Sequence, residues 1–110
     1  MTYKAGDIVV VPFPYADQLA EKRRPAVVVS AAALENDHGL LWVAMVTSTP
    51  SRRRGDVALS DLKATGLTVP CVVRPAKIAT INLARIVRKL GAIAAPDLNA
   101  LKAVLKRYSA

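Results

Sequence analysis

The sequence is poor in the residues that form disulfides and metal sites. Its 110 residues contain one cysteine, Cys71, and one histidine, His38. A lone cysteine excludes an internal disulfide and is typical of a reducing compartment. Without a cluster of cysteine and histidine we expect no structural zinc site. Cys71 stands among apolar residues and is expected to be a small buried hydrophobe, whereas His38 lies in a polar turn and is expected at the surface.

The sequence also lacks a long apolar run. No run reaches the roughly 18 residues that span a bilayer. The start, MTYKAGDIVVVPFP, superficially resembles a secretory signal, but Asp7 precedes its apolar run and Pro12 and Pro14 interrupt it. Asp17 and Glu21 follow where a small-residue cleavage site would lie. We therefore expect a cytoplasmic protein with no membrane contact.

Acidic and aromatic residues are scarce as well. Eight Asp and Glu stand against 16 Lys and Arg, which gives a net charge of +8. A surplus of this size favours a polyanionic partner such as a nucleic acid. Aromatics make up 5% of the chain, so the core must be built mainly from Val, Ile, Leu and Ala. The length fits one domain spanning residues 1–110.

Short extended segments separated by turns, followed by one amphipathic helix, predict a small and strongly bent antiparallel sheet or barrel. The helix is predicted over 96–109, where apolar residues recur at helical spacing. A single helical turn is predicted after 30, another over 61–66 with Ser60 as its N-cap and Gly66 as its stop. Residues 84–93 fit a helix or a strand equally well. The predicted strands are 6–14, 25–32, 40–48, 56–60 and 69–81.

Two features at the ends of predicted strands could contact a phosphate. Arg24, with Arg23 beside it, stands directly before Pro25 and a buried strand, so its guanidinium could be a preorganised phosphate clamp. The alternative is that both arginines end a loop and face water. Thr47 and Ser48 end the third strand and present hydroxyls, although such hydroxyls usually satisfy the local backbone.

A second arginine group lies in the predicted loop 49–55. Arg52, Arg53 and Arg54 suit backbone phosphates and predict salt-sensitive binding, with a merely solvated loop as the alternative. Tyr15 and Trp42 could stack on bases, but Trp42 lies in an apolar strand and is expected in the core. Lys77 in the later extended segment is a further candidate contact to RNA.

The sequence offers no zinc set, no Ser-His-Asp arrangement and no glycine-rich phosphate loop. RNA cleavage needs little of this equipment, because RNA carries its own nucleophile, the 2′-hydroxyl. A protein that cuts RNA in this way must hold the phosphate, stabilise its charge and help protons to move. Arginine forks and nearby hydroxyls suit that task.

The motifs GDIVVVPFP, RRPAVVVS, VAMVTS and GLTVPCVVRPAKIATI occur in an order that resembles the MazF/PemK family of toxin endoribonucleases. The resemblance runs from Gly6 to about Leu105. It implies a mainly β, SH3-like barrel of the CcdB/MazF type with short helices and a C-terminal helix. It also implies a homodimer and a cognate antitoxin that lays an acidic segment into the RNA groove. The segment ADQLAEKR is shorter than its counterpart in many members, which places the chain nearer the PemK-like branch.

By resemblance, the catalytic residues are Arg24 and Thr47. The implied reaction is cleavage of single-stranded RNA, mRNA by expectation, without a metal ion or other cofactor, leaving 2′,3′-cyclic phosphate and 5′-hydroxyl ends. The candidate RNA-binding residues are Arg23, Ser48, Arg52, Arg53, Arg54, Tyr15 and Lys77. Two alternatives stay open: a non-catalytic nucleic-acid-binding module of the same fold, and a CcdB-like topoisomerase poison.

Overall fold

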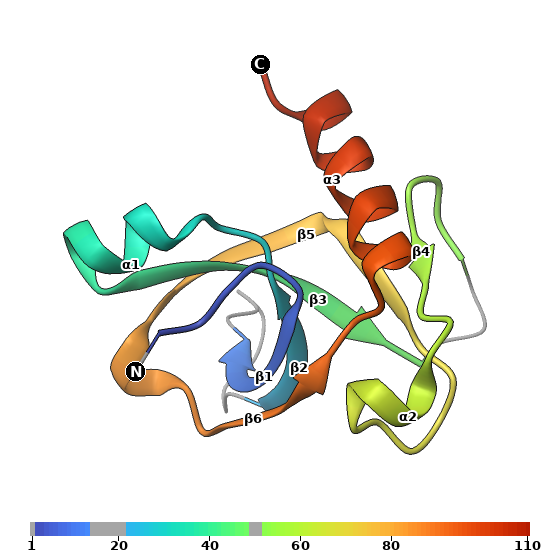
Figure 1. The fold of residues 1–110 in the computed structure, drawn as a ribbon, viewed down its shortest axis with the longest axis horizontal. Coiled ribbons are helices and arrows are strands. Elements are labelled where there is room, and N and C mark those ends of the chain that lie inside the picture. The colour runs from blue at the N-terminus through green and yellow to red at the C-terminus, as the bar shows by residue number, and fades with distance from the viewer. Residues whose placement is uncertain (1, 14–21, 49–51) are drawn as a thin grey trace.

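The computed structural model describes residues 2–13, 22–48 and 52–110. Six strands dominate these parts of the chain (Figure 1). The strands are β1 (Asp7–Phe13), β2 (Lys22–Val28), β3 (Leu40–Thr47), β4 (Val57–Ala58), β5 (Val72–Asn82) and β6 (Arg88–Ala92). The helices are α1 (Ala32–His38), α2 (Leu62–Thr65), the 3-10 turn η1 (Leu83–Arg85) and α3 (Ala95–Tyr108). None of the helices in these described ranges is long and apolar enough to cross a membrane.

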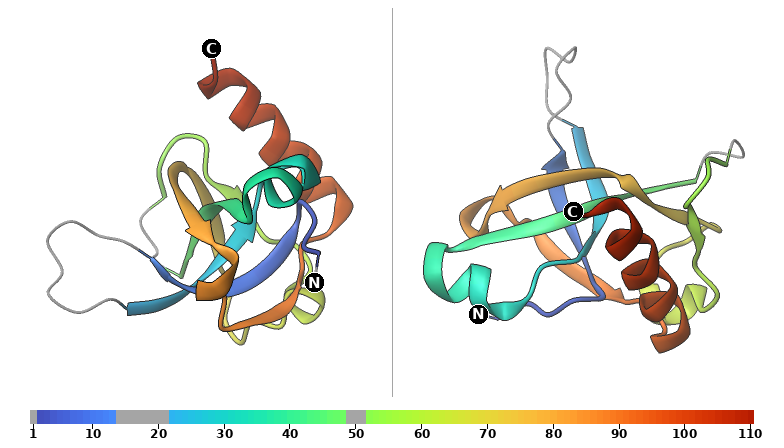
Figure 2. Two further views of the ribbon diagram at one scale, coloured as in Figure 1. Left: turned by 90° about the vertical axis from the view of Figure 1, so that its left-hand side faces the viewer. Right: turned by 90° about the horizontal axis from the view of Figure 1, so that it is seen from above.

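All six strands form one antiparallel sheet in the order β4-β5-β3-β2-β1-β6. The sheet curls strongly into a half-barrel, and α3 lies beside β4 and β5 on its outside (Figures 1 and 2). Two register shifts, in the β1–β6 and β3–β5 pairs, accompany the curl, as expected of bulges that bend strands. The mainly β fold with a C-terminal helix is thus as predicted.

Neighbouring residues of the central strands alternate between two apolar clusters, one on each face of the sheet. Ile8 and Val27 belong to the cluster under α3, whereas Val9, Ala26 and Val28 belong to the cluster on the other face. All five side chains are fully buried. The Val-rich second strand is therefore buried on both faces, as its sequence predicted, because strand side chains alternate with a period of two.

The C-terminal helix is confirmed by its packing. Leu101 is fully buried in the cluster of the α3 face, and Leu98, Val104 and Leu105 pack against that cluster. Asp97 in the first turn of α3 accepts hydrogen bonds from the amide and the hydroxyl of Ser60, both at 2.9 Å. The helix is thereby fixed to the segment that links β4 to α2.

Several predicted boundaries are wrong. The second strand begins at Lys22 rather than at Pro25, because Arg23 and Arg24 pair with β1. The helical turn after residue 30 extends to His38 and ends at Gly39. The undecided segment 84–93 is the turn η1 followed by strand β6, and the fourth strand shortens to two residues.

Two single-residue predictions also need correction. The cap of α2 is Asp61, whose side chain accepts from the amide of Ala64, because Ser60 is occupied by Asp97. Gly66 does end α2, with a positive φ of 74°. Trp42 is not in the core: half of its side chain is exposed, and it borders a groove beside the end of α3.

Candidate functional site

The register of β2 against β3 determines the site. Ala26 pairs with Met45 and Val28 with Val43. Carried two residues further, this antiparallel register sets Arg24 opposite Thr47. Arg24 is two positions from Ala26 and Thr47 is four positions from Val43, and both Ala26 and Val43 belong to the cluster on the face opposite α3. Because strand side chains alternate with a period of two, the side chains of Arg24 and Thr47 point from that same face. Two residues that are distant in the sequence are thus brought together.

A pocket of about 200 Å³ forms where these strands end, and we call it the Arg24 pocket. Arg24 and Thr47 both line it, together with the hydroxyl-bearing Ser48 and Thr68. The half-buried position of Arg24 removes part of its solvent, which strengthens its attraction for an anion. The remaining lining residues are Pro25, Val46, Leu67, Val69 and Cys71.

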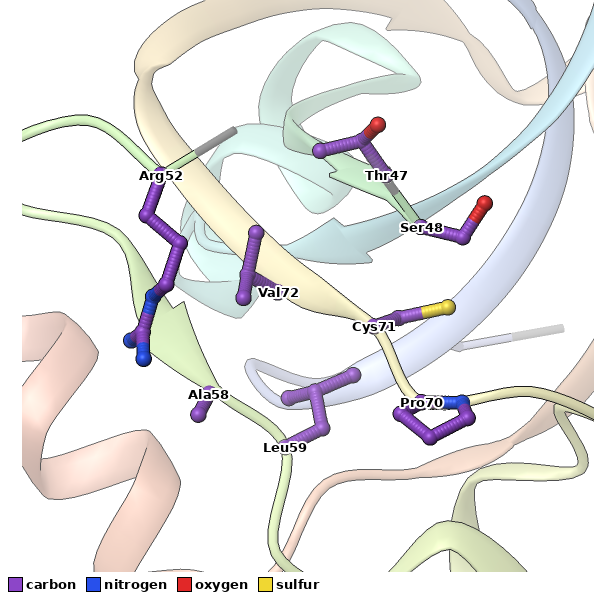
Figure 3. A pocket seen from close by; sticks show the side chains of 8 residues that line it. All are labelled: Thr47, Ser48, Arg52, Ala58, Leu59, Pro70, Cys71 and Val72. Carbon is purple, nitrogen blue, oxygen red and sulfur yellow. The ribbon is translucent and has the colours of Figure 1, made fainter. Parts of the chain in front are cut away.

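A second pocket of about 310 Å³, the Arg52 pocket, adjoins the first and shares Thr47, Ser48 and Cys71 with it. Figure 3 shows Ser48 and Cys71 projecting to the same side. The other lining residues are Arg52, Ala58, Leu59, Pro70 and Val72. The two pockets form one cleft with an arginine in each part and the hydroxyls of Thr47 and Ser48 between them.

Cys71 is half-buried rather than buried, so the prediction of a core residue is wrong. Burial still raises the pKa of its thiol above the ordinary value of 9.0. The thiol is therefore protonated at neutral pH and donates to the carbonyl of Val69 at 3.2 Å. A thiol in this state is a poor nucleophile, and we assign Cys71 to the wall of the cleft.

The other predicted contacts are scattered. Arg23 is exposed. Because it is adjacent to Arg24 in the strand, its side chain points from the opposite face of β2. Arg53 and Arg54 are exposed and line neither pocket, and neither does the half-buried Lys77. His38 is exposed at the end of α1, as predicted. Tyr15 lies outside the described residues.

Sequence reasoning missed the support beneath the arginines. Asp56 accepts hydrogen bonds from Arg74 Nε at 3.1 Å and Nη2 at 2.9 Å, and both side chains are almost fully buried. These bonds from Arg74, with one from the Arg53 amide, hold the pKa of Asp56 below its ordinary value of 3.8 against the opposing effect of burial. The Gly-Asp pair after three arginines signals a turn, but nothing in the sequence reveals a partner 18 residues away.

The fold and the cleft define a class: a small, mainly β protein whose curled sheet carries a cationic, hydroxyl-lined cleft at the ends of β2 and β3. A family model described as the PemK-like, MazF-like toxin of type II toxin-antitoxin systems matches residues 4–108. The chain therefore belongs to the MazF/PemK toxin family, as its motifs predicted.

Individual relatives agree. The chain is 34% identical over 94 residues to the endoribonuclease MazF9 of Mycobacterium tuberculosis, a match that covers 81% of this chain and 80% of that protein. It superposes on MazF of Deinococcus radiodurans with a TM-score of 0.76 at 28% identity, covering 98% and 96% of the two chains. The MazE-MazF complex from the same organism gives a TM-score of 0.75 at 25% identity, covering 98% and 95%. These likenesses confirm the predicted fold.

The Asp56–Arg74 pair predicts a pH dependence of stability. Because the pKa of Asp56 is lowered in the folded chain, its stabilisation is complete above the unfolded value and is lost as the pH falls through the folded value. Asp56→Asn should reduce the free energy of unfolding by about 3 kcal/mol at pH 7, since Arg74 is left buried without its counter-ion. Urea unfolding at pH 7, 4 and 3 should show this difference shrinking with acidity, and a constant difference would contradict the assignment.

Proposed function

We propose that this chain is the endoribonuclease toxin of a type II toxin-antitoxin system and cuts single-stranded RNA, mRNA in particular, in the cytoplasm. The observation that carries the proposal is the meeting of Arg24 and Thr47 in one pocket. Family membership and the curated endoribonuclease relative support it. We propose Arg24 and Thr47 as the catalytic residues.

The chemistry follows from what the cleft offers. The described residues that line its two pockets supply guanidinium and hydroxyl groups, with no carboxylate or imidazole among them. Such a lining suits a phosphate whose nucleophile is its own neighbouring 2′-hydroxyl. The 2′-oxygen attacks the phosphorus and the bond to the 5′-oxygen breaks, giving 2′,3′-cyclic phosphate and 5′-hydroxyl ends. The 2′-hydroxyl loses a proton and the 5′-oxygen gains one, so the reaction consumes no further reactant. We propose that it proceeds without a metal ion.

The two residues have different roles. Arg24 places its fork against the non-bridging oxygens, where negative charge grows in the transition state. An arginine side chain keeps its proton in proteins and is a weak candidate for a general base, so its effect is electrostatic. The Thr47 hydroxyl donates a hydrogen bond to the same phosphate, and Ser48 adds a contact to the substrate between the two pockets.

We expect Arg24→Ala to lower kcat by about 10² to 10³-fold, as the loss of a donor to a developing oxyanion does. Thr47→Val keeps the shape of the side chain and removes its hydroxyl, so it should lower kcat by about 10-fold. This corresponds to a rise of about 1.4 kcal/mol in the activation free energy. The assay is cleavage of a mixed-sequence RNA in EDTA, with the product ends mapped. The control is Arg107→Ala. Arg107 is an exposed arginine near the end of α3, so this substitution removes the same charge outside the cleft and should leave the rate unchanged.

Intact RNA after incubation with folded wild-type protein would overturn the proposal. Binding without cleavage would then favour the non-catalytic module. Absence of both would favour the topoisomerase poison. Cleavage by Arg24→Ala at the wild-type rate would leave the enzyme but remove the site.

We also infer a homodimer and an acidic antitoxin. MazF of D. radiodurans was solved with MazE, and a cleft lined by Arg24 and Arg52 would attract acidic side chains as it attracts phosphate.

The proposed dimer surface is an apolar groove between β3, β5 and α3. It is bordered by three side chains that are about half exposed, namely Trp42, Ile78 and Tyr108. Exposed apolar residues grouped in this way mark an association surface, and we assign it to the second copy. Sedimentation should give twice the chain mass, and a monomer after Trp42→Glu; a wild-type monomer would contradict the dimer.

A further inference from the structure

The arginine segment 52–55 is closed by a tight turn. Asp56 Oδ2 accepts from the amide of Arg53 at 2.7 Å, and the Asp56 amide donates back to the carbonyl of Arg53 at 3.0 Å. Gly55 provides the left-handed backbone, with a φ of 91°. These contacts fix the backbone of the segment although its arginine side chains are exposed.

The turn is tied to the sheet through the Asp56–Arg74 pair. Arg74 lies on β5 at the register shift opposite Met45, and only 6% of its side chain is exposed, against 1% for Asp56. Removing two charges from water costs several kcal/mol per ion, and an apolar pair of similar volume is often equally stable. Stability alone is thus a weak reason for the pair. Its two-pronged geometry instead sets the orientation of the turn relative to β5.

The turn is also tied to α3. The Tyr108 hydroxyl donates to the carbonyl of Arg54 at 3.2 Å. A Cβ on Gly55 would collide with that hydroxyl and come within 3.3 Å of Val104 Cγ1. Arg54 and Gly55 therefore lie directly against α3, and a side chain at position 55 would displace the Tyr108 hydroxyl. Figure 1 shows the chain before β4 running beside α3.

Arg52 is the arginine of this segment that lines the cleft, in a pocket that it shares with Thr47 and Ser48. Figure 3 shows its side chain along the Ala58 side of that pocket. We propose that Asp56, Arg74 and Tyr108 are positioning residues: they hold Arg52 beside Thr47, where it receives the phosphate next to the one that is cut. The inference rests on the proposed function, because it assumes an RNA strand in the cleft. An arginine on a fixed backbone loses less conformational freedom on binding than one on a loose loop. The three positioning residues should therefore raise the affinity of the protein for RNA.

The test measures binding to a mixed-sequence RNA that is 2′-O-methylated throughout, whose integrity is checked after each titration. Asp56→Asn should weaken binding about 10-fold and Tyr108→Phe about 3-fold. Each substitution should make the logarithm of the binding constant depend less steeply on the logarithm of the salt concentration, as Arg52→Ala should. The slope should fall in magnitude by up to about 0.7, which is the contribution of one phosphate contact to a single strand. With cleavable RNA, KM should rise while kcat stays within about 2-fold. Tyr108→Phe removes only the hydroxyl that binds the Arg54 carbonyl and keeps the ring that borders the apolar groove, so it tests the inference even where Asp56→Asn folds poorly.

The decisive comparison repeats both substitutions in an Arg52→Ala background. If the two substitutions act through Arg52, each should lower the affinity by less than a further 2-fold in that background. Losses of affinity that add to that of Arg52→Ala would show a general structural effect and overturn the inference. Glu35→Gln is the matched control, because it neutralises another buried carboxylate, on α1, and should leave affinity unchanged. Failure of folded wild-type protein to bind RNA would overturn the proposed function, whereas wild-type binding that ignores Asp56→Asn and Tyr108→Phe would overturn this inference alone.

Discussion

The pairing of β2 with β3 is the constraint on which the site depends. One register, fixed by Ala26 opposite Met45, places a guanidinium and a hydroxyl together at the ends of two buried strands. A shift of one residue would send Arg24 to the other face of the sheet and would move Ala26, Val27 and Val28 each into the opposite apolar cluster, where other side chains are already packed. Because Ala26, Val27 and Val28 are fully buried, the hydrophobic core that stabilises the fold also enforces the geometry of the cleft.

The cationic cleft has a second constraint, which is electrostatic. A chain with a net charge of +8 holds cations near one another at a cost in free energy. Asp56 reduces this cost locally, since it balances Arg74 from inside and closes the turn that carries Arg52. An anion in the cleft would supply the remaining compensation, whether it is a phosphate or the acidic segment of an antitoxin.

The sequence predicted the features that depend on local pattern. Strand β3, helix α3 and the stop at Gly66 follow from apolar spacing and backbone preference. The meeting of Arg24 and Thr47 came instead from resemblance to a family, because strand register joins residues whose separation carries no local signal. Arg23 and Arg24 looked like a loop end, yet pairing with β1 draws them into β2.

The misses share a physical cause, namely tertiary context that overrides local pattern. Trp42 is apolar and lies in an apolar strand, but half of its side chain is exposed, at the groove beside the end of α3. The Asp56–Arg74 pair joins a turn to a distant strand, and Ser60 gives up its expected role as a cap because Asp97 binds it. Each of these residues could be assigned only after the sheet and α3 were placed together.

The central claim is that the RNA's own 2′-hydroxyl is the nucleophile in a cleft built by Arg24 and Thr47. Its most direct test uses one RNA containing a mapped cut site, and the same RNA with a single 2′-O-methyl group on the nucleotide before the cut. We expect the unmodified strand to be cut and the methylated strand to stay intact at that site, with binding unchanged within a few fold. Cleavage of the methylated strand at the same bond would contradict the claim, because another nucleophile would then have to attack the phosphorus.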